Sequence, residues 1–91
     1  MYVAIAIHYP KPEHVDDFLA FMARVEAGMR GAPGLLSFES WRESDGGRLV
    51  GLSRWESGEA FAAALPRLLG IGGRDPAWSA RPDDLLRLVR P

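Results

Sequence analysis

Residues 34–56 read GLLSFESWRESDGGRLVGLSRWE, two strand-like runs joined by a short polar connection. The runs, Gly34–Ser44 and Arg48–Glu56, are rich in the aromatic and aliphatic residues that strands favour. The connecting residues 45–47 are Asp-Gly-Gly, which tolerate the positive φ angles of a tight turn. The sequence therefore predicts a β-hairpin at the centre of the chain.

A helix is predicted on each side of this hairpin. From Glu13 to Gly31, apolar residues recur every three or four positions, the spacing of one helical face; they are Val15, Phe18, Leu19, Met22, Val25 and Met29. After the hairpin, Ser57 is a natural N-cap for a second apolar stripe, formed by Ala60, Phe61, Ala64, Leu65 and Leu68. Because Pro66 lacks an amide hydrogen, this second helix is expected to break or kink there.

Strands are predicted at both ends of the chain. Tyr2–Tyr9 is apolar at nearly every position, which favours a strand covered on both faces, and Asp84–Arg90 alternates enough to form a last strand. The resulting order is that of the α+β class with a ferredoxin-like βαββαβ unit and a four-stranded antiparallel sheet. A length of 91 residues allows one domain, residues 1–91.

The first strand has a further consequence for assembly. Two helices cover only one face of a sheet, yet residues 3–7, Val-Ala-Ile-Ala-Ile, present apolar atoms to both faces. A second copy of the chain packed sheet to sheet would bury the open face and enlarge the small core of so short a chain. We therefore expect a homodimer through the sheet face.

Composition and charge exclude several kinds of partner. A net charge of −1 offers no bulk attraction for nucleic acid or an anionic membrane. The start, MYVAIAIHYP, lacks a basic region and its apolar run is too short to span a bilayer, so neither a signal peptide nor an anchor is expected and a cytoplasmic location is the default. Without cysteine, and with only two histidines and no carboxylate at ligand spacing, no metal site is expected.

Several short motifs resemble the antibiotic biosynthesis monooxygenase (ABM) domain family. They are Pro33-Gly34 at the start of the second strand, Trp55-Glu56-Ser57 at the end of the third, and Phe61, an aromatic residue six positions after the tryptophan. The resemblance covers most of residues 2–69 and implies a dimeric α/β barrel with a cavity between each sheet and its helices. Some members oxygenate quinols or anthrones without metal or flavin, and others degrade haem or isomerise small metabolites.

The resemblance implies a site around Trp55. In the aromatic-polyketide oxygenases of the family, an asparagine lies four residues before this tryptophan and a tyrosine six after it, where this chain has Gly51 and Phe61. One hydrophobic wall is kept and two polar groups are lost, while Ser53 offers a hydroxyl on the same face of the strand. The haem-degrading branch uses an asparagine in the first strand and a histidine after the second helix, and this chain has neither.

His8 is the candidate general base. It ends the first strand, and histidine side chains titrate near neutral pH, which suits removal of a phenolic proton before electron transfer to dioxygen. The alternative is a histidine at the rim of the sheet. Trp55 is the second candidate catalytic residue, and its alternative is structural, as a core aromatic that packs against Phe61 and the first helix.

Two residues after the second helix are further candidates for substrate binding. Arg74 lies about where the resembling oxygenases carry a cavity arginine and would hold an anionic oxygen, or it is a surface arginine. Trp78 either covers the mouth of the cavity as a lid or packs against the partner subunit.

The sequence thus predicts a cofactor-independent monooxygenase of the ABM type that acts on a small quinol-like or polycyclic aromatic molecule. The alternative is a non-catalytic dimeric protein that binds a small ligand or serves as an accessory in the same fold, or a small-metabolite isomerase. The loss of the asparagine and the tyrosine favours a non-catalytic binder.

Overall fold

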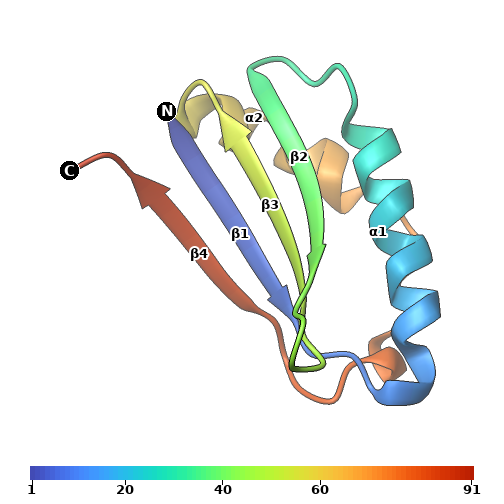
Figure 1. The fold of residues 1–91 in the computed structure, drawn as a ribbon. Coiled ribbons are helices and arrows are strands. Elements are labelled where there is room, and N and C mark those ends of the chain that lie inside the picture. Colours follow the sequence, from blue (N-terminus) through green and yellow to red (C-terminus); the bar gives the residue numbers. More distant parts are fainter.

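The structure is a computed structural model that describes residues 1–91. Its elements follow the order β1 (Tyr2–His8), η1 (Pro12–His14), α1 (Val15–Met29), β2 (Leu35–Arg42), β3 (Leu49–Trp55), α2 (Gly58–Leu69), η2 (Pro76–Trp78) and β4 (Asp84–Val89). The two η elements are single 3-10 turns. The predicted βαββαβ order is confirmed (Figure 1).

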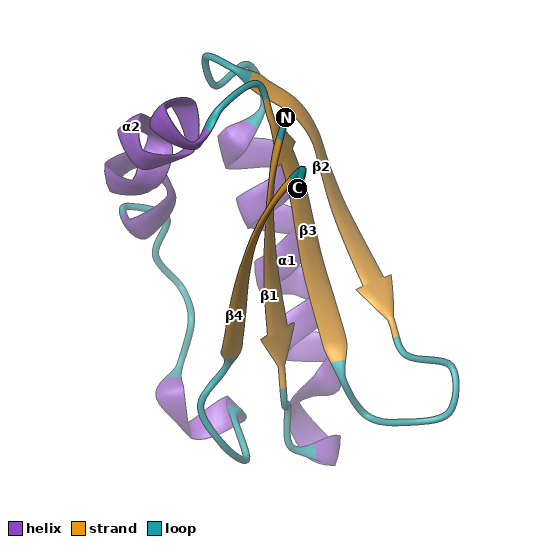
Figure 2. Ribbon diagram, turned by 90° about the vertical axis from the view of Figure 1, so that its left-hand side faces the viewer, coloured by secondary structure: helices purple, strands orange, loops and turns teal.

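The four strands form one antiparallel sheet in the order β2-β3-β1-β4. The first and last strands of the sequence are therefore neighbours, with Ala6 opposite Gly51 on β3 and opposite Leu85 on β4. Both helices lie on one side of the sheet, and the other side is uncovered (Figures 1 and 2). The fold thus has two layers.

The core lies between the helices and the sheet, in two clusters of buried side chains. The larger cluster surrounds Trp55, which is 1% exposed, and includes Met29 from α1 and Phe61 from α2. The smaller cluster consists of Phe18, Met22 and Leu49. The predicted apolar stripe of α1 supplies buried residues to both clusters, so the helical spacing is confirmed.

Two local details differ from the simplest expectation. Of the break or kink expected at Pro66, the break does not occur, because helix α2 continues to Leu69. The proline lies near the end of the helix, where only one amide hydrogen bond is lost and the exposed Ala62 leaves its carbonyl open to water. In the hairpin loop the glycines do not use positive φ angles. Positive φ occurs at Gly31 and Gly34, which close α1 and lead into β2, and at Gly73 after α2.

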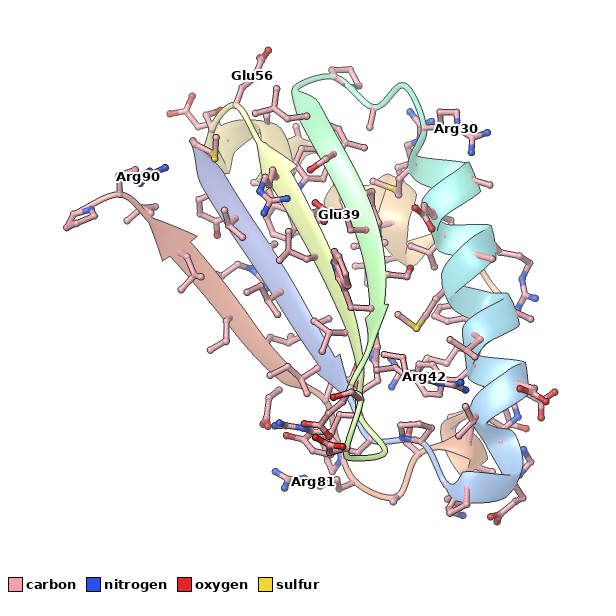
Figure 3. All side chains as sticks on the ribbon, in the orientation of Figure 1. Arg30, Glu39, Arg42, Glu56, Arg81 and Arg90 are labelled. Atoms are coloured by element: carbon pink, nitrogen blue, oxygen red, sulfur yellow. The ribbon has the colours of Figure 1, made fainter.

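The uncovered face of the sheet is largely apolar. On β1 this face carries Val3, Ile5 and Ile7, which alternate with the residues that face the helices and are only partly buried. On β4 it carries Leu86 and Leu88, which are 43% and 45% exposed. On the same face, Arg54 pairs with Glu39, which projects from the sheet in Figure 3. None of the helices is long and apolar enough to cross a bilayer.

Candidate functional site

A cavity of about 430 Å³ lies between the sheet and the two helices. The inner face of the sheet forms its floor, α1 and α2 form its walls, and the segment that follows α2 contributes to one end. Of its 21 lining residues, 14 are hydrophobic, so the cavity suits a ligand with a largely apolar body. Its volume lies within the usual range of small-molecule sites in proteins.

Small side chains in the middle of the sheet create this space. In the strand register, Ala6 lies opposite Gly51 and Ala4 opposite Ser53, so all four share the inner face. A Cβ added to Gly51 would meet only Nε2 of His8, at 3.9 Å, within a 4 Å radius. The floor is therefore open beside His8, as expected from the glycine at position 51.

His8 lies at the end of this floor and is 7% exposed. Its Nδ1 lies 3.0 Å from Oδ2 of Asp83, although the N–H does not point straight at that oxygen. The ring packs against Phe18, with 4.8 Å between the ring centroids. Because a carboxylate beside Nδ1 keeps a proton on that nitrogen, Nε2 is left as a proton acceptor on the cavity side.

Asp83 is held in turn by Arg74. The guanidinium donates two hydrogen bonds of 2.7 Å, one to each carboxylate oxygen, and its Cζ lies 4.9 Å from the centroid of the Phe18 ring. Burial alone would raise the pKa of Asp83, but the contacts with His8 and Arg74 outweigh it and hold that pKa well below its usual range. Asp83 therefore carries its charge at any pH at which the protein would be assayed.

Arg74 lines the cavity, but not in the manner expected from the sequence. The sequence left two alternatives, a surface arginine or one that holds an anionic oxygen of a substrate; in the structure both terminal nitrogens bind Asp83, with Ser79 Oγ as a further acceptor at 3.3 Å. The anionic oxygens that it binds belong to the protein. A carboxylate that arrives near His8 would have to compete with Asp83 for the same guanidinium.

The part of the cavity remote from His8 is formed by Trp55, Ser53 and Phe61. The Trp55 indole Nε1 donates a hydrogen bond of 2.8 Å to Ser53 Oγ, which itself lies 3.4 Å from the carbonyl of Ala4. Phe61 packs edge-on against the indole at 5.6 Å between centroids. The polar atoms of Trp55 and Ser53 are thus paired with the protein, so these residues offer a ligand an apolar wall rather than a free donor.

Trp78 is the one predicted site residue that the structure does not bring to the cavity. It lies in η2, stacks on His14 at 6.4 Å between centroids and packs against Phe18 from outside the cavity lining. The lid expected from the sequence is therefore not formed in this structure. Its contacts fix η2 against the start of α1 instead.

Two charged residues of the cavity were missed by the sequence analysis. Asp83 is 75 positions from His8 along the chain, and only the pairing of β4 with β1 brings them together. Arg87 lies opposite Ala4 on β4, with its Cζ 4.6 Å from the Phe61 ring centroid. No sequence signal pointed to either residue, because the sequence analysis predicted the order of the strands but not which of them pair.

Comparisons with known proteins agree with this architecture. The sequence profile described as antibiotic biosynthesis monooxygenase matches residues 1–66. The structure of Rv0793 from Mycobacterium tuberculosis has a TM-score of 0.84 at 23% identity, over 98% of this chain and 93% of that chain. A Nitrosomonas europaea protein placed in the same family has a TM-score of 0.87 at 19% identity, over 99% and 98%.

A third similar structure is the haem degrader MhuD of Mycobacterium tuberculosis, solved with two haems in its active site. Its TM-score is 0.76 at 24% identity, over 96% of this chain and 92% of that chain. A search of curated proteins gives no match. At these levels of identity the solved structures establish the fold that the chains share, while the chemistry of the cavity must be argued from its own residues.

Proposed function

Because the chain belongs to the antibiotic biosynthesis monooxygenase family, we propose that it oxygenates a small aromatic molecule in its cavity without a bound cofactor. The proposal rests chiefly on His8. This buried imidazole has a carboxylate at Nδ1 and an open apolar cavity at Nε2. A base placed in this way meets the requirement of the first chemical step, removal of a proton from a phenolic or benzylic position.

The proposed reaction uses dioxygen as the only other reactant. Nε2 of His8 accepts a proton from the substrate, and the resulting anion passes one electron to dioxygen. The two radicals combine to form a carbon–oxygen bond, the imidazolium returns its proton to the peroxide, and loss of water leaves a carbonyl. For an anthrone-like substrate, one methylene group and one dioxygen molecule give one carbonyl group and one water molecule, so atoms and electrons balance without an added reductant.

The neighbours of His8 support each stage of this sequence. Asp83 stabilises the imidazolium that forms when Nε2 takes the proton, since its carboxylate lies 3.0 Å from Nδ1. Arg74 fixes that carboxylate from the other side. The apolar walls around Trp55 and Phe61 keep water from the anion before it meets dioxygen.

The experiment that tests the function is oxygen uptake by the purified, metal-stripped protein with a panel of hydroquinones, hydroxynaphthoates and anthrones. Uptake above that of heat-treated protein is expected. The variant Gly51→Leu should lower it at least about tenfold, because the new side chain would fill the floor beside His8. The matched control is Gly47→Leu in the hairpin loop, where an added Cβ meets nothing within 4 Å, so uptake should be unchanged.

The outcomes of this experiment separate the three candidate functions. No uptake with any member of the panel would contradict the oxygenase. Saturable binding without uptake would favour the non-catalytic binder, and conversion without oxygen consumption would favour an isomerase. Equal uptake by wild type and Gly51→Leu would show that the reaction does not take place in this cavity.

We also propose that the active form is a homodimer joined through the uncovered face of the sheet. This face exposes Leu86, Leu88 and Trp41 by 43%, 45% and 58%, which is unusual for a free surface of so small a chain. Sedimentation equilibrium at micromolar concentration should give twice the mass of the chain. Leu86→Glu should shift this mass toward the monomer, whereas Ala63→Glu on the exposed side of α2 should not. A monomeric wild type would contradict the proposal.

A further inference from the structure

The charges that line the cavity do not cancel. Asp83 is paired with both Arg74 and His8. Arg87 also lines the cavity, but no carboxylate lies within ion-pair distance of it, and its only hydrogen bond goes to the carbonyl of its neighbour Leu86, at 3.3 Å. The cavity therefore carries one positive charge that the protein itself does not neutralise.

The position of Arg87 is fixed by the sheet and by an aromatic ring. In the register of β4 with β1, Arg87 lies opposite Ala4, so its side chain projects from the same face as the cavity floor. The guanidinium carbon lies 4.6 Å from the centroid of the Phe61 ring. Stacking on a ring face leaves the edge donors of a guanidinium free to form paired hydrogen bonds with a carboxylate.

Arg87 and His8 stand at opposite ends of the floor. His8 is four residues beyond Ala4 on β1, which corresponds to about 13 Å along the strand. Between them the floor carries the small residues Ala4, Ala6 and Gly51, with Leu85 of β4 beside Ala6. A flat ligand that spans this distance has one end at the base and the other at the free cation.

From this arrangement we infer that the cavity takes an aromatic acid, a fused-ring molecule whose carboxylate is bound by Arg87 while its ionisable hydroxyl or benzylic carbon lies at His8. The inference rests on the proposed function, since it assigns the ligand class of the same cavity. It goes further in making Arg87 the residue that selects acids over neutral ring systems. The two arginines thus have separate tasks, Arg74 toward Asp83 and Arg87 toward the ligand.

The test is a binding measurement that needs no turnover. Anthraquinone-2-carboxylate and its carboxamide differ in charge but little in shape, and 6-hydroxy-2-naphthoate, whose hydroxyl lies at the end of the ring system remote from the carboxylate, provides a shorter pair with its amide. By isothermal titration calorimetry, wild type should bind at least one acid about tenfold more tightly than the matching amide. Added salt should weaken binding of the acid and leave that of the amide unchanged.

Arg87→Gln should abolish the preference for the acid over the amide. Arg87→Lys, which keeps the positive charge, should retain part of that preference. The matched control is Arg90→Gln, which removes a charge from the end of the same strand but outside the cavity and should leave the preference unchanged (Figure 3). Equal affinity of wild type for acid and amide in both pairs, an undiminished preference in Arg87→Gln, or no binding of any of the four compounds would each overturn the inference.

The result is distinguishable from failure of the proposed function. Loss of the acid preference in Arg87→Gln without any oxygen uptake by wild type would establish the ligand class and leave a binding protein. Oxygen uptake that is indifferent to Arg87→Gln, combined with equal affinities for acid and amide, would keep the oxygenase and remove the role of Arg87.

Discussion

Replacing His8 by asparagine is expected to lower the rate of oxygen uptake at saturating substrate by about 10²- to 10⁴-fold, the usual contribution of a positioned general base. Asparagine retains a polar group at the end of β1 but cannot accept a proton from a substrate. The loss should appear mainly in kcat, because the apolar walls that bind the ring system remain in place. A variant that keeps more than a tenth of the wild-type rate would exclude His8 as the base.

The chain offers a matched control for this substitution. His14 lies 2.9 Å from Asp17 through its Nδ1, so it too is a histidine paired with an aspartate, but it is partly exposed in η1 and does not line the cavity. His14→Asn should leave the rate unchanged. A similar loss in both variants would mean that the assay responds to the fold or to surface charge rather than to the base.

The pH profile distinguishes a base from a structural histidine. A general base acts only in its unprotonated form, so the rate should rise with pH, and this rise should be absent from His8→Asn. Asp83 cannot produce the same rise, since its pKa is held well below the usual carboxyl range and its charge is constant across such a profile. Asp83→Asn should reduce the rate and alter the profile while the base is still present, which marks it as a positioning residue.

The sequence was most informative where the signal is local. The spacing of apolar residues in α1 predicts a helix regardless of what lies beside it, and the hairpin at the centre of the chain determines which strands are adjacent. These two patterns were sufficient for the order of elements. At Pro66 the sequence left open a break or a kink, because the cost of a proline depends on how much helix follows it and on whether the freed carbonyl reaches water; the structure shows that α2 continues to Leu69.

The site was predicted only in part, because here too the sequence is informative only where the signal is local. Residues such as Gly51 and Trp55 share a face by the alternation of one strand, which can be read from sequence alone. The surroundings of His8 depend instead on the register between β1 and β4, which no local pattern specifies. From the sequence, a substrate oxygen is therefore a possible partner of Arg74. In the structure its partner is Asp83, which lies just before β4.

Replacing Trp55 by alanine is expected to lower the free energy of unfolding by about 3–5 kcal/mol, the usual cost of removing a large buried aromatic side chain. The indole is 1% exposed and packs against Phe61, so its loss leaves a cavity that the two layers cannot easily collapse to fill. Since domains of ordinary stability unfold at about 5–15 kcal/mol, this variant should be only marginally folded. Urea unfolding followed by far-ultraviolet circular dichroism measures the change.

Trp55→Phe then separates the structural role of this residue from a chemical one. Phenylalanine keeps an aromatic wall and loses the hydrogen bond to Ser53, whose hydroxyl still has the carbonyl of Ala4 at 3.4 Å. The loss of stability should therefore be smaller, about 1–2 kcal/mol. Because the indole N–H is already bound to Ser53 and points to no ligand, oxygen uptake by Trp55→Phe should stay within a few-fold of wild type. A well-folded Trp55→Phe protein that has lost turnover would instead show that the indole takes part in the chemistry, and Trp55 would then join His8 as a catalytic residue.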